Sequence, residues 1–364
     1  MKLLSILHRW SGGLIGLLLA LLGLTGAILV WEGEWISVTG ADDPVVERVD
    51  RIAAVSESAV ADGATRITFA SEEIGLHLVV KKDGGGEYVR QNGEVAASWA
   101  SEWERPELWI FDLHHHLFAG VTGEWVTGIA GIFGLLFVIT GAILWWRSRR
   151  AFEWRLWPRK IQPGPIVRHH RDFGILITPL LLVSFLTGLG MLFPAAAKVV
   201  LSPFGTIAAS AKPPIVEPAE QPAAIPAMLR EAKARFPNAA LRRLTVPARP
   251  DGAYSIRMRQ PSEWTPNGRT TLYFDRAGKL VRVDDPAGAG LAASINEKFY
   301  PVHTAKVGGL AWKLAMTLSG LGLALLGSLA VWSFWIRRVI HRRSRRPHPR
   351  VSLTPPSSAA APQS

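Results

Sequence analysis

The sequence predicts a mainly α membrane protein, with four transmembrane helices in a bundle and two small α+β modules outside the membrane. Of the 364 residues, 48% are hydrophobic, and they concentrate in four runs that contain no charged residue. Long polar segments separate the first run from the second and the third from the fourth, and turn signals divide these segments into short strand-like and helix-like stretches. The four apolar runs cover residues 10–31, 125–146, 173–197 and 314–336.

Each apolar run is long enough to cross a membrane. A helix of about 20 residues, rising about 1.5 Å per residue, spans a hydrocarbon core of roughly 30 Å. The first run follows Lys2 and Arg9 and so resembles a signal peptide, but it ends in Trp31, Glu32 and Gly33. A cleaved signal has a shorter apolar region and a small-residue cleavage site. We therefore expect an uncleaved anchor.

The distribution of Lys and Arg predicts the orientation. Residues 147–172 hold eight Lys or Arg against two acids, and the chain after residue 336 holds seven Arg and no acid. Residues 32–124 hold only seven Lys or Arg against eighteen acids. Because short basic segments stay on the cytoplasmic side, both termini and the middle loop are expected there. The net charge of +12 then reflects topology, so the expected partner is membrane lipid and not nucleic acid.

The polar segments divide the chain further. The first contains strand-like runs at 65–71 and 76–99, and the second contains a helix at 226–237 followed by four strand-like runs up to residue 285. The expected divisions are a first transmembrane helix (1–31), a first α+β module (32–110), an outer His segment with the second helix (111–146), a basic loop (147–172), a third helix (173–197), a second α+β module (198–300), an outer His segment with the fourth helix (301–336) and a disordered tail (337–364).

The two halves of the chain repeat one another. The sequence "HRWSG" opens the first apolar helix and "HRDFG" opens the third, so both follow HRxxG. In each helix a Thr-Gly pair follows, and the distance from His8 to Thr25 equals that from His170 to Thr187, at 17 residues. Since both helices enter from the same side, the pattern indicates a parallel internal repeat.

Histidine is the residue type that could carry chemistry here. The chain has no Cys, which excludes disulfides, thiolate metal sites, iron–sulfur clusters and covalent haem attachment through Cys. Most of the ten histidines lie at helix ends, and they form one group for each membrane face. Two imidazoles from opposing helices are the arrangement that ligates a haem on both sides.

We therefore predict two haem sites, with the haem irons as the metals bound. His8 pairs with His170 at the inner face, and His114 pairs with His303 at the outer face. Small residues beside the inner pair would admit a flat macrocycle, and Arg9 and Arg171 could bind its propionates. The small residues are Gly12, Gly13 and Gly174.

Other readings remain open from the residues alone. His169 could replace His170, and His115 or His116 could replace His114, because successive helical residues point about 100° apart. The outer histidines together with Asp112 could hold zinc or copper. Any single His beside an Arg at a membrane end could also be an interface residue. A straight helix from His114 to residue 146 would be about 48 Å long and would lift the outer site above the membrane unless it bends near Gly120 or Gly123.

Several stretches resemble the PepSY-associated transmembrane helix family, which includes proteins named iron-regulated membrane proteins. The matching residues read "LHRWSGGLIGLLLALLGLTGAILVW", "LHHHLFAGVTGEWVTG", "TGAILWW", "HHRDFGILITPLLLVSFLTG" and "VHTAKVGGLAWK". Residues 227–285 resemble a PepSY domain. By position, the family's histidines fall on His8, His114, His170 and His303.

The resemblance implies a multi-pass haem protein of the bacterial inner membrane, with the two PepSY-like modules in the periplasm. Some relatives reduce ferric siderophores there. We accordingly expect two haem b groups per chain and a ferric reductase activity, with a quinone or a cytoplasmic reductase as the electron donor. The alternatives are a haem or metal sensor and a non-catalytic anchored module that binds or regulates a periplasmic partner.

Overall fold

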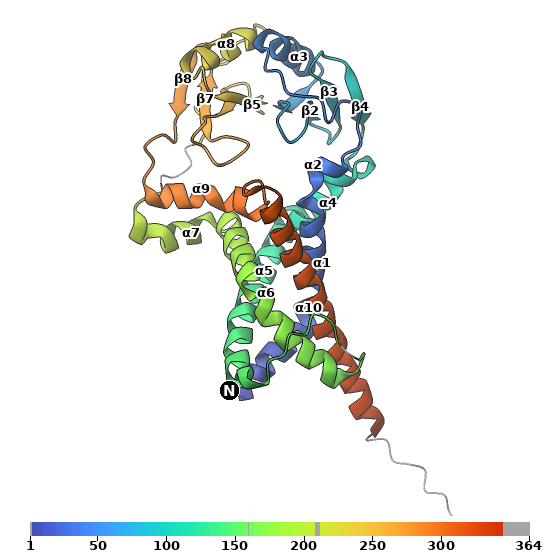
Figure 1. Cartoon of the computed structure of the whole chain (residues 1–364). Helices are drawn as coiled ribbons and strands as arrows, with labels where there is room; N and C mark the ends of the chain where they lie inside the picture. The colour runs from blue at the N-terminus through green and yellow to red at the C-terminus, as the bar shows by residue number, and fades with distance from the viewer. Residues whose placement is uncertain (1, 159, 208–211, 345–364) are drawn as a thin grey trace, which may run out of the picture.

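The computed structural model describes residues 2–158, 160–207 and 212–344. Four long helices form a bundle, and a β-sheet domain lies at one end of it (Figure 1). All four are long and apolar enough to cross a membrane, which confirms the predicted spans. We call the end next to the sheet the sheet end, and the opposite end, where the first helix begins, the far end. The helices are α1 (Lys2–Leu29), α5 (Gly120–Ser148), α6 (Pro163–Leu192) and α10 (Gly309–Ser344).

Glycines allow these helices to pack closely. A Cβ atom added to Gly23 of α1 would lie 2.5 Å from the carbonyl oxygen of Gly320 of α10, and one added to Gly16 would lie 2.8 Å from that of Gly327. Small residues at such positions let membrane helices approach until their backbones touch. Gly16 and Gly23 therefore allow α1 and α10 to pack with their backbones in contact.

The helix boundaries differ from the expected ones at three places. Helix α6 ends at Leu192, five residues before the expected end at residue 197. Helix α6 begins at Pro163, ten residues before the expected start, because a proline is well tolerated in the first turn of a helix. Helix α10 continues to Ser344, so the expectation of disorder over 337–364 is wrong for 337–344. No Gly or Pro interrupts this basic stretch before Pro347. The remainder of the predicted tail lies outside the described residues.

The expected outer His segments are short helices of their own, α4 (Pro106–His116) and α9 (Leu291–His303). Helix α4 ends in left-handed Leu117 and Phe118 (φ 49° and 59°), and α5 starts afresh at Gly120. A Cβ atom on Gly123 would overlap the carbonyl of His116, so α4 lies against the start of α5. The straight helix of about 48 Å is therefore not formed, and the bend foreseen near Gly120 is a complete break.

Contrary to the expectation of two separate modules, the strands form one antiparallel sheet of eight, in the order β4-β3-β2-β1-β5-β6-β7-β8. The two halves of the chain join where β1 pairs with β5, with Ile67 opposite Leu244. Each half supplies one helix and four strands. These are α3 (Val49–Ala61), β1 (Ala64–Thr68), β2 (Leu76–Lys81), β3 (Gly86–Arg90) and β4 (Val95–Trp99), then α8 (Ile225–Arg235), β5 (Ala240–Thr245), β6 (Tyr254–Arg259), β7 (Thr270–Phe274) and β8 (Leu280–Asp284).

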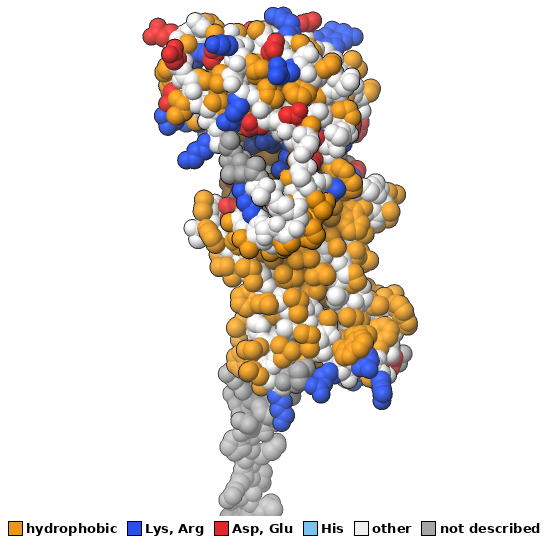
Figure 2. All heavy atoms as spheres, turned by 90° about the vertical axis from the view of Figure 1, so that its left-hand side faces the viewer, with side chains coloured by type: hydrophobic (Ala, Val, Ile, Leu, Met, Phe, Trp, Pro, Cys, Tyr) orange, Lys and Arg blue, Asp and Glu red, His pale blue; other side chains and the backbone are white. Residues whose placement is uncertain are grey.

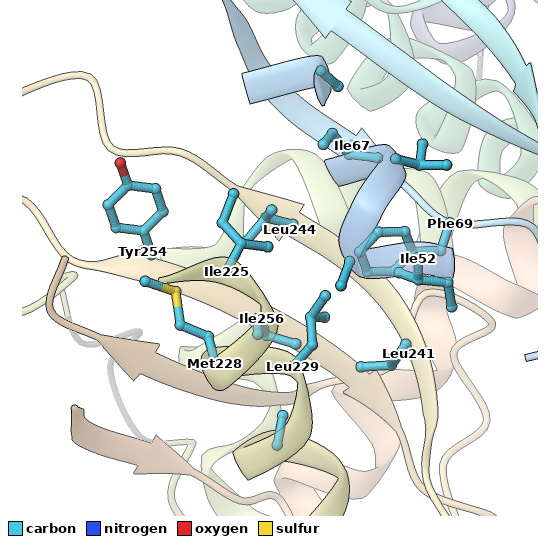
Figure 3. Close-up of a cluster of buried hydrophobic side chains, with 14 of the residues drawn as sticks. Ile52, Ile67, Phe69, Ile225, Met228, Leu229, Leu241, Leu244, Tyr254 and Ile256 are labelled. Atoms are coloured by element: carbon cyan, nitrogen blue, oxygen red, sulfur yellow. The ribbon is translucent and has the colours of Figure 1, made fainter. Parts of the chain in front are cut away.

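The sheet is covered by helices on the face turned away from the bundle (Figure 1). Ile67, Leu244 and Ile256 of the sheet pack with Ile52 of α3 and Leu229 of α8, and all are buried (Figure 3). Because side chains alternate along a strand, the residues between these core positions face the bundle. The remaining elements are α2 (Glu32–Trp35), η1 (Glu102–Glu104), η2 (Arg149–Ala151), α7 (Pro194–Leu201) and η3 (Ser202–Phe204).

Candidate paired-histidine sites

At the sheet end, His114 of α4 lies against a Thr-Gly pair of α1. Its Nδ1 is 2.9 Å from Thr25 Oγ1, and a Cβ atom added to Gly26 would lie 3.0 Å from its Cε1. The hydroxyl of Thr25 already donates its only hydrogen to the carbonyl of Leu21, at 2.9 Å. It therefore accepts from the imidazole, which places the ring proton on Nδ1 and leaves the lone pair on Nε2.

The second half of the chain repeats this arrangement. Nδ1 of His303 on α9 lies 3.1 Å from Thr187 Oγ1 and 3.1 Å from the carbonyl of Ser184, and Gly188 leaves room for the ring. Thr187 donates to the carbonyl of Val183 at 2.7 Å, so Nδ1–H is again the donor. The repeated Thr-Gly pairs thus hold two histidines that come from neighbouring helices.

A third Thr-Gly pair lies at the far end, and sequence reasoning did not assign it a role. His8 Nδ1 is 2.8 Å from Thr140 Oγ1 of α5, and a Cβ atom added to Gly141 would lie 3.6 Å from its Cε1. Thr140 donates to the carbonyl of Leu136 at 2.6 Å. The second apolar run contains "TG" twice, at Thr127-Gly128 and Thr140-Gly141, so the motif was present but did not by itself single out the pair beside His8.

The fourth histidine, His170 of α6, lacks such a partner. Leu329 stands 20 residues after the start of α10, as Thr140 stands 20 residues after the start of α5, so leucine replaces threonine in the repeat. The backbone of Leu326 lies near the His170 ring, yet Nδ1 is buried without a hydrogen bond of ordinary geometry. Three of the four imidazoles are thus oriented by threonine.

The far-end pair has the spacing of two ligands on one metal ion. The rings of His8 and His170 have their centres 6.4 Å apart with their planes at 79°. Metal–nitrogen bonds of roughly 2 Å on opposite sides of an ion place the ring centres roughly 6 Å apart. Together with the free Nε2 lone pair of His8, this spacing fits a haem iron.

Burial keeps both histidines of the sheet-end pair neutral. Burial, together with the nearby His303, lowers the pKa of His114 to about 3. Burial likewise lowers the pKa of His303 to about 4. Neutral imidazoles are the form that binds a metal, so burial prepares both rings for ligation at neutral pH.

The two pairs lie at opposite ends of the bundle. His8 and Thr25, which mark the two levels on α1, are 17 residues apart, or about 26 Å along the helix axis. His170 and Thr187 mark the same levels on α6. This separation approaches the roughly 30 Å hydrocarbon thickness of a membrane.

A family model described as the PepSY-associated TM region matches residues 5–338. The chain belongs to this PepSY-associated family. The match includes all four helices of the bundle, the sheet domain and the four paired histidines. No curated protein matches the chain.

The alternative histidines of this PepSY-associated protein point elsewhere. His115 stacks on Phe111 with ring centres 4.9 Å apart, and His116 Nδ1 lies 2.8 Å from Asp112. His169 donates its Nε2–H to the carbonyl oxygen of Leu156, 3.0 Å away. Among the described residues, no group of three or more His, Cys, Asp or Glu is arranged to hold a metal ion, so the structure does not support the zinc or copper reading.

The two arginines predicted to bind propionates differ in their availability. Arg171 donates to Asp172 at 2.7 Å and to the carbonyl of Ala151 at 2.5 Å, so its guanidinium is already engaged. Asp172 is fully buried and also binds Arg155. Arg9 is exposed and has no hydrogen bond or ion pair within the described part of the chain. Of the two, only Arg9 is free for an added anion.

Proposed function

We propose that this PepSY-associated protein is a haem protein of the bacterial inner membrane that moves electrons across the membrane to ferric iron, held as a ferric siderophore in the periplasm. The observation that carries the proposal is the presence of a histidine pair at each end of the bundle, with the rings of His8 and His170 at the spacing of two ligands on one ion. Each pair joins two helices, as bis-imidazole haem ligation requires.

The surface supports the proposed orientation. Figure 2 shows hydrophobic side chains around the bundle, with Lys and Arg side chains at the far end. Basic residues flanking a span mark the cytoplasmic side. Both termini then lie in the cytoplasm, and the sheet domain lies in the periplasm.

Haem b, when bound, would supply one-electron redox chemistry at each pair. The chain's own residues orient the ligands: Thr25, Thr140 and Thr187 each accept an Nδ1–H, which strengthens the imidazole as a ligand through Nε2. The overall reaction takes one electron per ferric ion from a quinone or cytoplasmic reductase and yields Fe(II). Fe(II) is held more weakly than Fe(III) by hard oxygen ligands, so the iron is released.

A reduced-minus-oxidised visible spectrum of the purified protein, together with the haem-to-chain ratio, tests the proposal. We expect low-spin b-type bands and two haems per chain. His8→Ala and His303→Ala should each remove one haem, whereas His116→Ala, which leaves both pairs intact, should remove none.

Activity is tested next, with a ferric siderophore as acceptor and a chelator that traps Fe(II). Absence of haem after expression with haem supplied would refute the proposal and leave a non-catalytic anchored module. Haem with no ferric reduction would favour a sensor.

A further inference from the structure

Three arginines lie side by side on the face of the sheet that is turned toward the bundle. Arg66 of β1 and Arg243 of β5 each directly precede a core residue, and Arg257 of β6 directly follows one. Since neighbouring side chains on a strand point to opposite faces, the three arginines lie opposite α3 and α8. We call them the arginine cluster.

The cluster has no counter-charge of its own. None of its members makes a hydrogen bond or ion pair through its side chain in the described residues. Arg243 and Arg257 occupy directly opposed positions on β5 and β6, and Arg66 is one diagonal step away, since Thr68 is opposite Arg243. Like charges in such positions destabilise a sheet.

The cluster is also partly withdrawn from water. Burial, together with the charges of Arg257 and Arg66, lowers the pKa of Arg243 to about 10. Burial also lowers the pKa of Arg257. Glu263, the carboxylate that interacts electrostatically with Arg257, is itself buried and accepts hydrogen bonds from the backbone of Arg269 and from Thr270. Arg243 and Arg257 are half-buried and Arg66 is exposed beside them. Three such cations without a free acid form a site for an anion.

The cluster lies close to the sheet-end histidines. Tyr300 of α9 interacts electrostatically with Arg243. The hydroxyl of Tyr300 accepts a hydrogen bond from Asn267 Nδ2 at 3.4 Å. His303 follows Tyr300 by one helical turn on the same face. Figure 2 shows a hollow on this side between the sheet domain and the bundle, with Lys and Arg side chains around it.

We propose that the arginine cluster binds the ferric substrate, and that this substrate is therefore an anionic chelate whose iron is held by carboxylate or catecholate oxygens. The inference rests on the proposed function and adds the charge class of the substrate. Guanidinium groups match the paired oxygens of such ligands and bind them with charge-assisted hydrogen bonds. A cationic hydroxamate chelate would be repelled from the same surface.

Binding can be measured without any electron transfer by using gallium(III) chelates, because gallium(III) resists reduction. Calorimetric titrations of the full-length protein would use gallium citrate, a gallium tricatecholate and the cationic gallium complex of desferrioxamine B. Arg243→Gln and Arg257→Gln should weaken binding of the anionic chelates at least about tenfold, as loss of a sheltered charge pair does. Arg235→Gln removes the same charge from α8, on the opposite side of the sheet, and should change the dissociation constant less than about twofold.

The thermal midpoint separates a binding role from a structural one. Relief of like-charge repulsion should leave the midpoint of Arg243→Gln unchanged or raised, while its affinity falls. A lowered midpoint with unchanged affinity, or equal affinity for the cationic chelate, would overturn the proposal. If only gallium citrate or only the gallium tricatecholate binds, the result identifies the iron ligand as a carboxylate or a catecholate. If the purified protein contains no haem but still binds the anionic chelates, the proposed function is refuted and the arginine cluster remains an anion-binding site.

Discussion

Alanine at Gly188 tests whether the Thr-Gly pairs exist to seat a histidine ring. The added Cβ atom would lie 3.0 Å from Cε1 of His303, 3.4 Å from Nδ1 and 3.7 Å from Nε2. Carbon atoms pack best at about 3.5–4.0 Å, so the ring must move by roughly half an ångström or more. Overpacking of this kind costs about 1–3 kcal/mol, from which the better helix propensity of alanine removes up to about 1 kcal/mol.

A net cost of up to about 2 kcal/mol corresponds to a loss of haem affinity at the sheet-end pair of up to about thirtyfold. The matched control is Gly141→Ala, because the same substitution in the third Thr-Gly pair places a Cβ atom 3.6 Å from Cε1 of His8, an ordinary contact. Haem titration of the purified apoproteins, followed by absorbance, measures both sites. Equal effects of the two substitutions, or loss at the far end in Gly188→Ala, would refute the reasoning.

Four further predictions follow from single contacts. Thr187→Val should lower haem affinity at the sheet end several-fold, which haem titration would show. Leu329→Thr should give His170 a hydrogen-bond partner and lower the midpoint potential of the far-end haem, which redox titration would show. Asp172→Ala leaves two arginines without their buried partner and should cost about 3–5 kcal/mol, seen as a lower thermal midpoint; an unchanged midpoint contradicts this. Burial lowers the pKa of His77 to about 4 from 6.5, so its contribution to sheet-domain stability is complete above pH 6.5 and is lost as the pH falls toward 4, by about 2 kcal/mol at pH 5. Chemical denaturation of wild type and His77→Gln across this range should show the loss only in wild type.

The amino-acid sequence by itself determined the features that depend on local pattern. Four apolar runs of sufficient length must become membrane helices, because a lipid-exposed backbone has to satisfy its hydrogen bonds internally. All eight strands and helix α8 lie where alternation and helical spacing predicted them. Helix α3, Val49–Ala61, was not identified, since its small and polar residues give a weaker signal. The equal spacing from His8 to Thr25 and from His170 to Thr187 already indicated two levels on repeated helices.

Only the tertiary structure decided the features that depend on contacts distant in sequence. The pairing of β1 with β5 joins two modules into one sheet and brings Arg66 beside Arg243, which no local pattern encodes. The rotation of α4 about its axis decides which histidine after Asp112 faces the bundle. Successive residues of a helix point about 100° apart, so a shift of one residue changes the histidine that enters. The left-handed break at Leu117 sets that rotation and seats His114 on Gly26, because only the glycine leaves space for the ring.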